Sequence, residues 1–376
     1  MYDVPHLRFP EFSGEWEKYR LCDVASIVGR IGFRGYTTND IVTKGKGAIA
    51  LSPTNIENNK LTYDKDNTYI SFYKYEESPE IMIKQGDVIF VKTGSTVGKV
   101  AYVDKLICKT TLNPQVVVLK DIQCDNYLLS VLMSTNKFQN AIRKIIVGGA
   151  VPTLSQAAMG DIVVTMPQAT EQEKLSKFIS LLDDRIATQN KIIEKLQSLI
   201  KGLAAQLTQS GTPNVRLCDC LECHSSTLQE NCVSATGSYP VYGATGLIGY
   251  TNGYAYNGES ILIVKDGSGV GSLSYANDCY SVIGTLNYLT AKGKYSVLYL
   301  YYALMAFNFT PYITGMANSS YLFQRLWESK SILPSIENQI RIASLLHNIE
   351  QKLVVEQNLI ISLSAQKSYL LRMLFI

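Results

Sequence analysis

The residues with the most obvious chemistry are clustered in the segment Cys-Asp-Cys-Leu-Glu-Cys-His at 218–224, with Cys232 close behind. Thiolate and imidazole groups at such spacings bind zinc, and Cys-x-x-Cys-His is also the pattern of haem attachment. Haem attachment of this kind requires export, and the chain starts without the basic segment and apolar core of a secretory signal. Cys218 aligns with Cys22, which stands alone in a related segment. We therefore favour small buried thiols over a metal site, with zinc as the alternative.

A glycine loop, Gly94–Lys99, follows an apolar segment and superficially resembles a phosphate-binding loop. That motif requires four residues between its glycines and a Ser or Thr after the lysine, whereas three residues and Val100 stand here. A second copy of the loop carries Ser272 in place of the lysine. We expect a tight turn whose glycines permit close approach of the backbone, either to another strand or to a DNA phosphate; both interpretations stay open.

No catalytic constellation emerges from the remaining residues. The three histidines, His6, His224 and His347, belong to no recognisable triad or metal motif. The segment Asn113–Val116 differs from the Asn-Pro-Pro-aromatic motif of amino-methyltransferases. An enzyme acting alone is therefore the least favoured interpretation.

Length and composition indicate a globular protein of two or three domains: 376 residues, 46% hydrophobic and 18% charged. The net charge of +3 indicates neither nucleic acid nor membrane. The most apolar stretch, residues 295–309, is shorter than the roughly 20 residues of a membrane span, so we expect a buried helix there. Eight unevenly spaced cysteines in a chain of this size indicate reduced thiols and a cytoplasmic location.

An internal repeat organises the chain. The sequence separation between the two members of a matching pair decreases from the first pair to the third. After the third pair the two copies align without a gap. The differences in length therefore lie before the helices that end each copy. We therefore expect two globular parts of variable length (the heads), each followed by a long helix of constant length (the stem). The matching pairs are Arg20–Asp23 with Arg216–Asp219, Gly86–Gly98 with Gly258–Gly271, and the segments that start at Pro167 and Pro334.

The two stems are expected to be long helices over 170–208 and 337–375, each roughly 58 Å long. Thr170 and Glu173 have the spacing of a capping box at the first start. Apolar residues occupy nine of ten heptad seam positions in the first helix and eight of ten in the second, which is typical of a coiled coil. An antiparallel pair would hold two similar heads related by a pseudo-two-fold axis.

Gln189 and Glu356 occupy the same middle layer of their repeats, in a mostly apolar seam. If the helices pack antiparallel, these two side chains can meet and fix the register, at some cost in stability. Alternatively, both side chains reach solvent at the edge of the seam.

The heads are expected to have an α+β fold, because strand and helix patterns mix without regular alternation. Strands are predicted at 88–91, 100–103 and 116–119, and a helix at 126–144. The second head carries six basic and seven acidic residues, so it is not basic overall. The predicted divisions are 1–169 for the N-terminal segment and first head, 170–210 for the first helical region, 211–333 for the second head and 334–376 for the second helical region.

The order and duplication of these motifs resemble the specificity subunit of type I restriction-modification systems. The resemblance extends over essentially the whole chain. The segments that carry it are Pro5–Trp16, Gly86–Val103, Pro167–Phe178, Tyr239–Tyr250 and Pro334–Leu345.

The resemblance implies a DNA reader that is not itself catalytic and binds no cofactor. Each head would be a target recognition domain that reads one half of a split sequence in double-stranded DNA, and the helices would set the unread spacer. Two modification subunits would dock on the helices and bring S-adenosylmethionine for adenine methylation. Restriction and translocase subunits, with ATP and Mg²⁺, would complete the enzyme. No membrane is implied, and the weak basicity of the second head implies that partner subunits supply phosphate attraction.

Candidate DNA contacts are polar or basic side chains suited to base edges or phosphates, each of which could equally be a solvated surface residue. In the first head they are Arg30, Arg34, Lys44, Lys46, Thr93, Ser95 and Lys99. In the second head they are Asn252, Tyr254, Lys265, Ser268, Lys292 and Lys294.

Two further functions are compatible with the same sequence. A methylation complex without a nuclease would use the same reader. An adaptor that binds only protein through its helices and heads would not bind duplex DNA even with its partners present.

Overall fold

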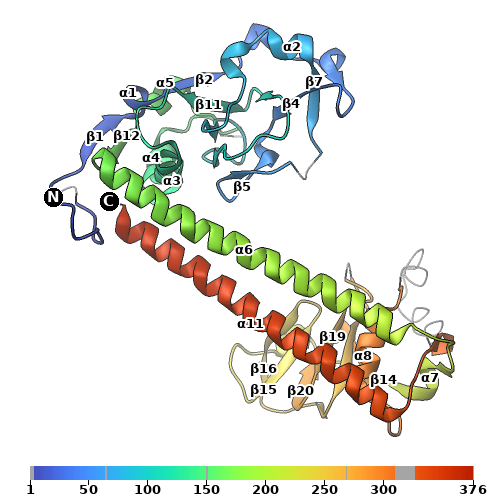
Figure 1. Ribbon diagram of the computed structural model, residues 1–376. Helices are drawn as coiled ribbons and strands as arrows, with labels where there is room; N and C mark the ends of the chain where they lie inside the picture. The colour runs from blue at the N-terminus through green and yellow to red at the C-terminus, as the bar shows by residue number, and fades with distance from the viewer. Residues whose placement is uncertain (1–3, 64–65, 150, 268, 310–326, 376) are drawn as a thin grey trace. The chain divides into compact units, whose positions relative to one another are not determined.

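Two helices of about forty residues dominate the computed structural model, which describes residues 4–63, 66–149, 151–267, 269–309 and 327–375 (Figure 1). Helix α6 spans Ala169–Thr208 and helix α11 spans Ile336–Leu374. Each predicted helix is present, with its start shifted by one residue. Thr170 therefore lies inside the first turn of α6 and is not its cap; the N–H of Gln172 donates to the carbonyl of Gln168 (3.0 Å).

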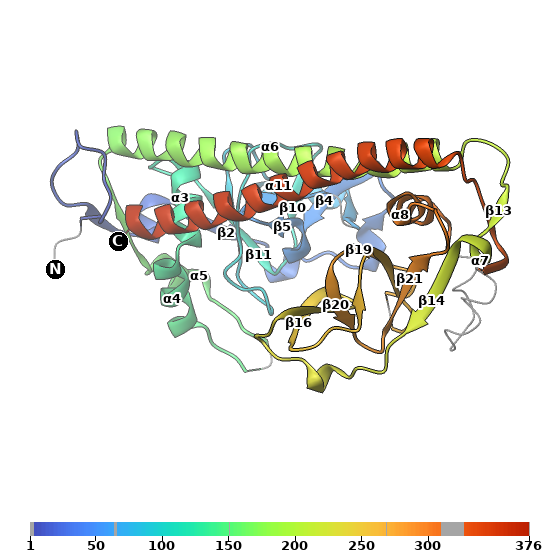
Figure 2. The ribbon, with the colours of Figure 1, turned by 90° about the horizontal axis from the view of Figure 1, so that it is seen from below.

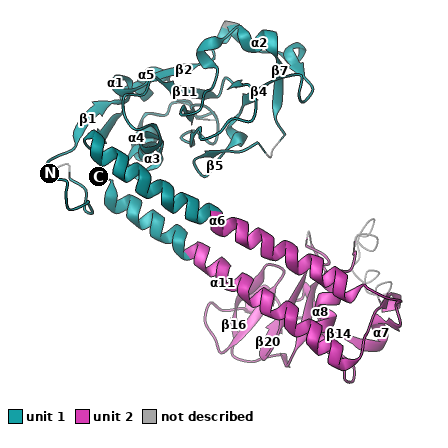
Figure 3. Ribbon diagram, viewed as in Figure 1, with its two compact units in different colours: residues 1–187, 362–376 teal, residues 188–361 magenta. Residues whose placement is uncertain are grey.

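The chain divides into two compact units, residues 1–187 with 362–376 (unit 1) and residues 188–361 (unit 2), as Figure 3 shows by colour. Each unit holds one head and a segment of both long helices. In unit 1, Leu175 and Ile179 of α6 share a core with Leu374 of α11.

In unit 2, the equivalent core of the helix pair joins Ile200 and Ala204 of α6 to Ala343 and Leu346 of α11. Within unit 2, Gln189 bonds to Glu356 whereas Ile200 shares a core with Leu346, so the two helix segments run antiparallel. The four residues of unit 2 lie at or next to predicted seam positions, and burial of such a stripe is the main stabilising term of a helix pair.

The head of unit 1 combines strands and short helices. Its six-stranded sheet has the order β2-β11-β8-β9-β6-β5, its four-stranded sheet has the order β10-β4-β7-β3, and β1 pairs with β12. The bounds are β1 Glu17–Arg20, α1 Leu21–Val24, β2 Ser26–Gly29, β3 Ile41–Val42, β4 Gly47–Leu51, β5 Ile56–Glu57, β6 Lys60–Leu61, β7 Thr68–Ser71, α2 Phe72–Glu76, β8 Val88–Val91, β9 Val100–Tyr102, β10 Thr110–Leu112, β11 Val116–Lys120, α3 Asn126–Ser134, α4 Asn136–Ile145, α5 Gln156–Gly160 and β12 Val163–Met166.

The head of unit 2 repeats this plan in fewer residues. Its sheets have the orders β14-β21-β18-β19 and β16-β15-β20-β17, and β13 pairs with β22. The bounds are β13 Val215–Arg216, α7 Leu217–Cys220, β14 Leu221–Ser225, β15 Tyr239–Gly243, β16 Gly246–Thr251, β17 Tyr256–Asn257, β18 Ser260–Val264, β19 Leu273–Ala276, β20 Cys279–Val282, β21 Leu286–Ala291, α8 Val297–Met305 and β22 Lys330–Ser331.

The expected α+β heads and the internal repeat are confirmed. Strand β14 takes the place of β2, β21 that of β11, β18 that of β8 and β19 that of β9, all antiparallel in both units. The three strands predicted in the first head are present. The single helix predicted over 126–144 is wrong, because Thr135 adopts an extended conformation and its side chain caps a separate helix, α4.

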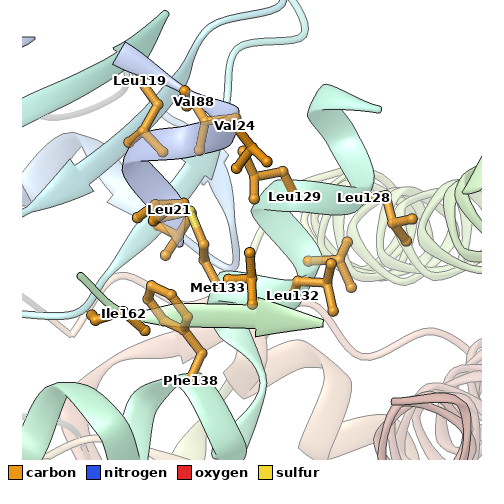
Figure 4. Packing of buried hydrophobic residues seen from close by; sticks show 14 of the residues in the cluster. Leu21, Val24, Val88, Leu119, Leu128, Leu129, Leu132, Met133, Phe138 and Ile162 are labelled. Carbon is orange, nitrogen blue, oxygen red and sulfur yellow. The ribbon is translucent and has the colours of Figure 1, made fainter. Parts of the chain in front are cut away.

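The core of unit 1 lies where the six-stranded sheet, the short helices and the long helices meet. Figure 4 shows side chains of α1 (Leu21, Val24), α3 (Leu129, Met133) and α4 (Phe138) converging there. Fully burying side chains of this kind contributes roughly 1.5–3 kcal/mol each.

In unit 2, α8 lies between the long helices and the sheet (Figure 2). Tyr299 and Tyr302 of α8 are fully buried, which confirms the buried helix expected in this apolar segment. Among the described residues, no helix is both long enough and apolar enough to cross a membrane.

In unit 1 the N-terminal segment contacts the end of α11 and the start of α6. The N–H of Leu7 donates to the carbonyl of Met373 (2.9 Å). Arg8 forms a bidentate ion pair with the fully buried Glu171 at the start of α6, with distances of 2.7 and 2.8 Å. A buried carboxylate requires such a partner, so the N-terminal segment is part of the fold rather than a loose end.

Candidate nucleic-acid interface

The glycine loop of unit 1 is a tight turn that joins β8 to β9. The N–H of Val91 donates to the carbonyl of Lys99 (2.9 Å), and the N–H of Gly98 donates back to the carbonyl of Val91 (3.0 Å). Gly94 and Gly98 have φ angles of +106° and +98°, which glycine adopts without the steric cost that a Cβ brings.

The loop of unit 2 has the same hydrogen bonds at the equivalent residues of the second copy. The N–H of Val264 donates to the carbonyl of Ser272 (3.0 Å), and the N–H of Gly271 donates to the carbonyl of Val264 (2.9 Å). Gly267 and Gly271 have φ angles of +91° and +87°. The repeat detected in the sequence is therefore a repeat of backbone geometry.

The glycines of the first loop approach parts of their own unit. The side chain of Gln139 in α4 donates to the carbonyl of Gly98 (2.8 Å), and a Cβ on Gly98 would lie 2.5 Å from the Gln139 amide oxygen. The N–H of Gly94 donates to the carbonyl of Pro152 (2.9 Å). These internal contacts account for the glycines, while the side chains of Ser95 and Lys99 are exposed.

Lys99 borders a shallow depression of about 320 Å³ together with Asn58 and Asn59. Its Nζ donates to the carbonyl of Ile56 (3.3 Å). The two asparagines have φ angles of +49° and +60° in the turn between β5 and β6. Sequence reasoning missed them, although an Asn-Asn pair is a signal for such a left-handed turn.

Arg30 is not a surface residue, which corrects its prediction as a DNA contact. Only 6% of the residue is exposed. Its guanidinium donates to the carbonyl of Leu112 (2.9 Å), to the hydroxyl of Thr111 (3.1 Å) and to the carbonyl of Arg34 (3.2 Å). Burial lowers the pKa of Arg30. It stabilises the head from inside.

Of the remaining basic candidates of unit 1, Arg34 is held by acidic neighbours, and the two lysines lie apart from the glycine loop. Arg34 contacts Glu80 (3.6 Å) and the carbonyl of Glu77 (3.3 Å). Lys44 and Lys46 are exposed in the turn before β4. Strand β4 is roughly 17 Å long at 3.4 Å per residue. Its far end, at Leu51, is the end that is connected to the glycine loop.

That connection runs through backbone hydrogen bonds. The carbonyl of Leu51, at the end of β4, accepts from the N–H of Asn113 (2.8 Å). Two residues later the carbonyl of Gln115 accepts from Lys92 (2.9 Å) and Thr93 (3.3 Å), at the start of the loop. Thr93, Ser95 and Lys99 are thus together, and Lys44 and Lys46 are at the opposite end of β4.

The candidates of unit 2 also separate. Lys265 starts the second loop, and its N–H donates to the carbonyl of Thr285, just before β21 (3.0 Å). Lys292 and Lys294 follow the far end of β21, where the Nζ of Lys292 donates to the carbonyl of Cys218 (2.8 Å). Ser268 lies outside the described residues.

Asn252 and Tyr254 are exposed in the turn between β16 and β17. The ring of Tyr254 packs edge-on against Tyr239, with centroids 4.9 Å apart. An aromatic ring fixed in this way at the surface offers a face and a hydroxyl to a ligand.

The cysteine cluster of unit 2 lies in helix α7 and strand β14. Cys220 is buried, Cys223 accepts a hydrogen bond from the amide of Asn287 (3.3 Å), and His224 bonds to Thr290 (2.9 Å). Burial raises the pKa of Cys220 to about 12 and that of Cys223 to about 11. Within the described ranges, no group of three His, Cys, Asp or Glu side chains is placed to hold a metal ion.

One detail of the cysteine prediction is wrong. Cys22 is exposed and Cys218 is partly exposed; the buried thiol of this segment is Cys220, two residues later. In the short helix α7, Leu217 and Cys220 face the core because residues three apart share a face.

Gln189 and Glu356 lie together in unit 2. The amide of Gln189 donates to the carboxylate (2.5 Å) and to the main-chain carbonyl (3.2 Å) of Glu356. Gln189 is 6% exposed, so its amide is paired rather than extended into solvent.

Comparisons with known proteins give one consistent result. The model of the family described as type I restriction modification DNA specificity domain matches residues 13–198 and, a second time, residues 214–365. The MjaVIII specificity subunit of Methanocaldococcus jannaschii is 25% identical over 209 residues, 54% of this chain and 44% of that protein. The EcoprrI specificity subunit of Escherichia coli is 27% identical over 112 residues, 30% of this chain and 28% of that protein. The matched stretch thus spans less than half of either relative.

Solved structures share the fold over nearly the whole chain. The crystal structure of the S subunit of a type I restriction-modification system from M. genitalium has a TM-score of 0.66 at 16% identity and covers 99% of both chains. A chain from a structural study of complex assembly in a type I system has a TM-score of 0.50 at 17% identity, covering 95% of this chain and 96% of that one.

Proposed function

This chain belongs to the type I restriction-modification DNA specificity family, and from that premise we propose that it reads a split DNA sequence, each head recognising one half. The observation that carries the proposal is the pair of heads that share the order of four strands (β2-β11-β8-β9 and β14-β21-β18-β19) and one loop geometry. Two related readers in one chain suit a site with two halves. The proposed divisions are residues 1–169 and 211–333 for the recognition domains, and 170–210 and 334–376 for the helical regions.

Within each head, we place the base-reading surface at the end of the sheet that carries the glycine loop. In unit 1 this end presents Thr93, Ser95 and Lys99, with Asn58 and Asn59 beside Lys99. Hydroxyl, amide and ammonium groups are suited to base edges and phosphates.

In unit 2 this end presents Lys265. The exposed amide of Asn252 and ring of Tyr254 are separate candidates, because their turn bonds through Ala255 to Tyr280 of β20 and not to the loop. Lys44 and Lys46, and likewise Lys292 and Lys294, lie at the opposite strand ends. They therefore cannot contact the same base pairs as the loops. We propose them only as contacts to DNA phosphates.

The long helices serve as the docking surface for the modification subunits in this proposal. In unit 2 they expose several apolar side chains. Single exposed apolar residues are common on protein surfaces, but here they recur along a helix pair. They are Leu199, Val354, Val355, Leu359 and Ile361, from 37% to 67% exposed.

The catalytic groups of the complex would come from its other subunits. Modification subunits would bring S-adenosylmethionine and methylate adenines, and restriction and translocase subunits would use ATP and Mg²⁺, all in the cytoplasm. A methylation complex without the nuclease would use the same reader.

The experiment is to coexpress the chain with its modification subunit and to map methylated adenines in the host genome by single-molecule sequencing. We expect a two-part motif that disappears when this gene is deleted. Unchanged methylation with an assembled and active complex would contradict the proposal and support a protein-binding adaptor.

A further inference from the structure

A glutamine in the first turn of each long helix makes the same pair of hydrogen bonds in both units. In unit 1, the Gln172 amide nitrogen donates to the carbonyl of Pro167 (2.8 Å). Its amide oxygen accepts from the N–H of Asp125 (2.9 Å). In unit 2, Gln339, the counterpart of Gln172 in the second copy, donates to Pro334 (2.9 Å) and accepts from the N–H of Ser296 (3.1 Å).

The residues that these glutamines reach are caps of the helix by which each head packs on the long helices. The carboxylate of Asp125 accepts from the N–H of Leu128 (2.7 Å) at the start of α3. The hydroxyl of Ser296 accepts from the N–H of Tyr299 (3.2 Å) at the start of α8. One amide thus links the start of a long helix to the start of a head helix.

A second polar contact holds each head helix further along its stem. The hydroxyl of Tyr127 donates to the carboxylate of Asp183 (2.7 Å) in unit 1. The hydroxyl of Tyr302 donates to the carboxylate of Glu350 (2.7 Å) in unit 2. Asp183 and Glu350 again occupy equivalent positions of the two copies.

The two tyrosines, however, come from different turns of their helices. Tyr127 is the second residue of α3, and Tyr302 is the sixth residue of α8. The two carboxylates occupy equivalent positions in the repeat, whereas the two tyrosines do not. Both units therefore have the second contact, but they make it with different residues of the head. Its recurrence supports a requirement for two-point attachment.

Two attachment points fix the orientation of the head helix on the long helix, which apolar packing alone does not fix. Burial of apolar surface is non-directional, whereas a hydrogen bond weakens steeply when its angle is bent. We propose that Gln172 and Gln339 are positioning residues, which fix the direction of each head on its helix and so restrict the reader to one spacer length. This inference rests on the proposed function.

The test measures spacer selectivity instead of total activity. Plasmids would carry the two half-sites at the native spacing and at spacings one base pair shorter and longer. Q172M and Q339M remove both hydrogen bonds at similar volume, and Q172E and Q339E retain only the acceptor. We expect methylation at altered spacings, relative to the native spacing, to rise about tenfold in the Met variants and less in the Glu variants.

The controls remove a partly buried hydrogen bond that lies inside a head. Thr110→Val deletes the bond from Thr110 to the carbonyl of Cys108 (2.9 Å), and Ser225→Ala deletes the bond from Ser225 to Asn287 (2.9 Å). Both are expected to lower the unfolding midpoint without changing the spacer ratio. A general loss of stability therefore cannot imitate the predicted effect.

The outcomes separate the two proposals. A wild-type complex that methylates no split site would contradict the proposed function, whatever the variants do. A wild-type complex with one preferred spacing, together with glutamine variants of unchanged ratio, would overturn the positioning role alone. If a Met variant does not fold, the Glu variant and Tyr127→Phe, which removes the bond to Asp183, give the same ratio measurement.

Discussion

The amide of Gln189 and the carboxylate of Glu356 are hydrogen-bonded across the helix pair of unit 2, and their positions are equivalent in the two copies of the repeat. Each is therefore the other's counterpart. The amide also donates to the main-chain carbonyl of Glu356, so sliding one helix along the other would break two bonds at once. A polar pair in an apolar seam is the best-attested device for fixing register.

Replacing both residues by leucine tests this register role. We expect an unchanged or higher unfolding midpoint, because apolar packing replaces a polar pair, together with a mixture of helix registers. Cysteine pairs placed across the helices at the native register and one heptad away would report the registers by crosslinking. A single, unchanged register in the double variant would show that the pair does not set it.

The same pair predicts a dependence of stability on pH. The hydrogen bond from Gln189, and secondarily the bond from Lys352, lowers the pKa of Glu356 below 4.5. A carboxyl group with a lowered folded-state pKa contributes stability above its unfolded pKa and loses it as the pH falls through the folded value. We expect the unfolding midpoint of the wild type to fall more steeply below pH 4.5 than that of E356Q. Parallel curves would contradict this account.

Lys99 is predicted to contact a DNA phosphate. Lys99→Ala should weaken binding by a similar factor for every DNA sequence and should reduce the slope of log affinity against log salt by about 1. The matched control is Lys105→Ala, which removes an equal charge from an exposed site beyond the other end of β9. Equal effects of the two substitutions would indicate net charge alone, and a loss confined to certain sequences would place Lys99 at a base.

Arg30→Met should destabilise the first head by about 2 kcal/mol, because the carbonyl of Leu112 and the hydroxyl of Thr111 lose a charged donor in the interior. Arg34→Met is the control, since its partly exposed ion pair with Glu80 is worth little. Thermal unfolding measures both. An unchanged midpoint for Arg30→Met would show that water replaces the guanidinium.

Thiol reactivity should separate the cysteines of the second head. At pH 8, Cys232 is exposed and should be alkylated rapidly, whereas Cys220 is buried with a pKa of about 12 and should react only after unfolding. Treatment with a chelator should leave the unfolding midpoint unchanged, since Cys223 and His224 are bonded to other side chains. A chelator-dependent fall in the midpoint would restore the zinc interpretation.

Local sequence patterns were sufficient to predict elements whose conformation depends on their own residue types. The apolar runs 88–91 and 116–119 are strands because β-branched residues fit a buried sheet, and the glycine loops turn because glycine alone takes positive φ at little cost. The division of 126–144 was missed because Thr135 suits a helix cap as well as a helix interior. Only packing on both sides decides which role it takes.

The sequence by itself determined the duplication, the two long helices and the mixed heads, because these depend on periodicity and on repeated residue types. It also placed Gln189 and Glu356 in one layer, since the repeat period counts residues along the chain. Tertiary structure alone decided that Arg30 is buried, that Thr93 lies away from Lys44, and that Gln172 joins a long helix to a head helix. Burial and hydrogen-bond partners depend on segments distant in the sequence, which no local pattern encodes.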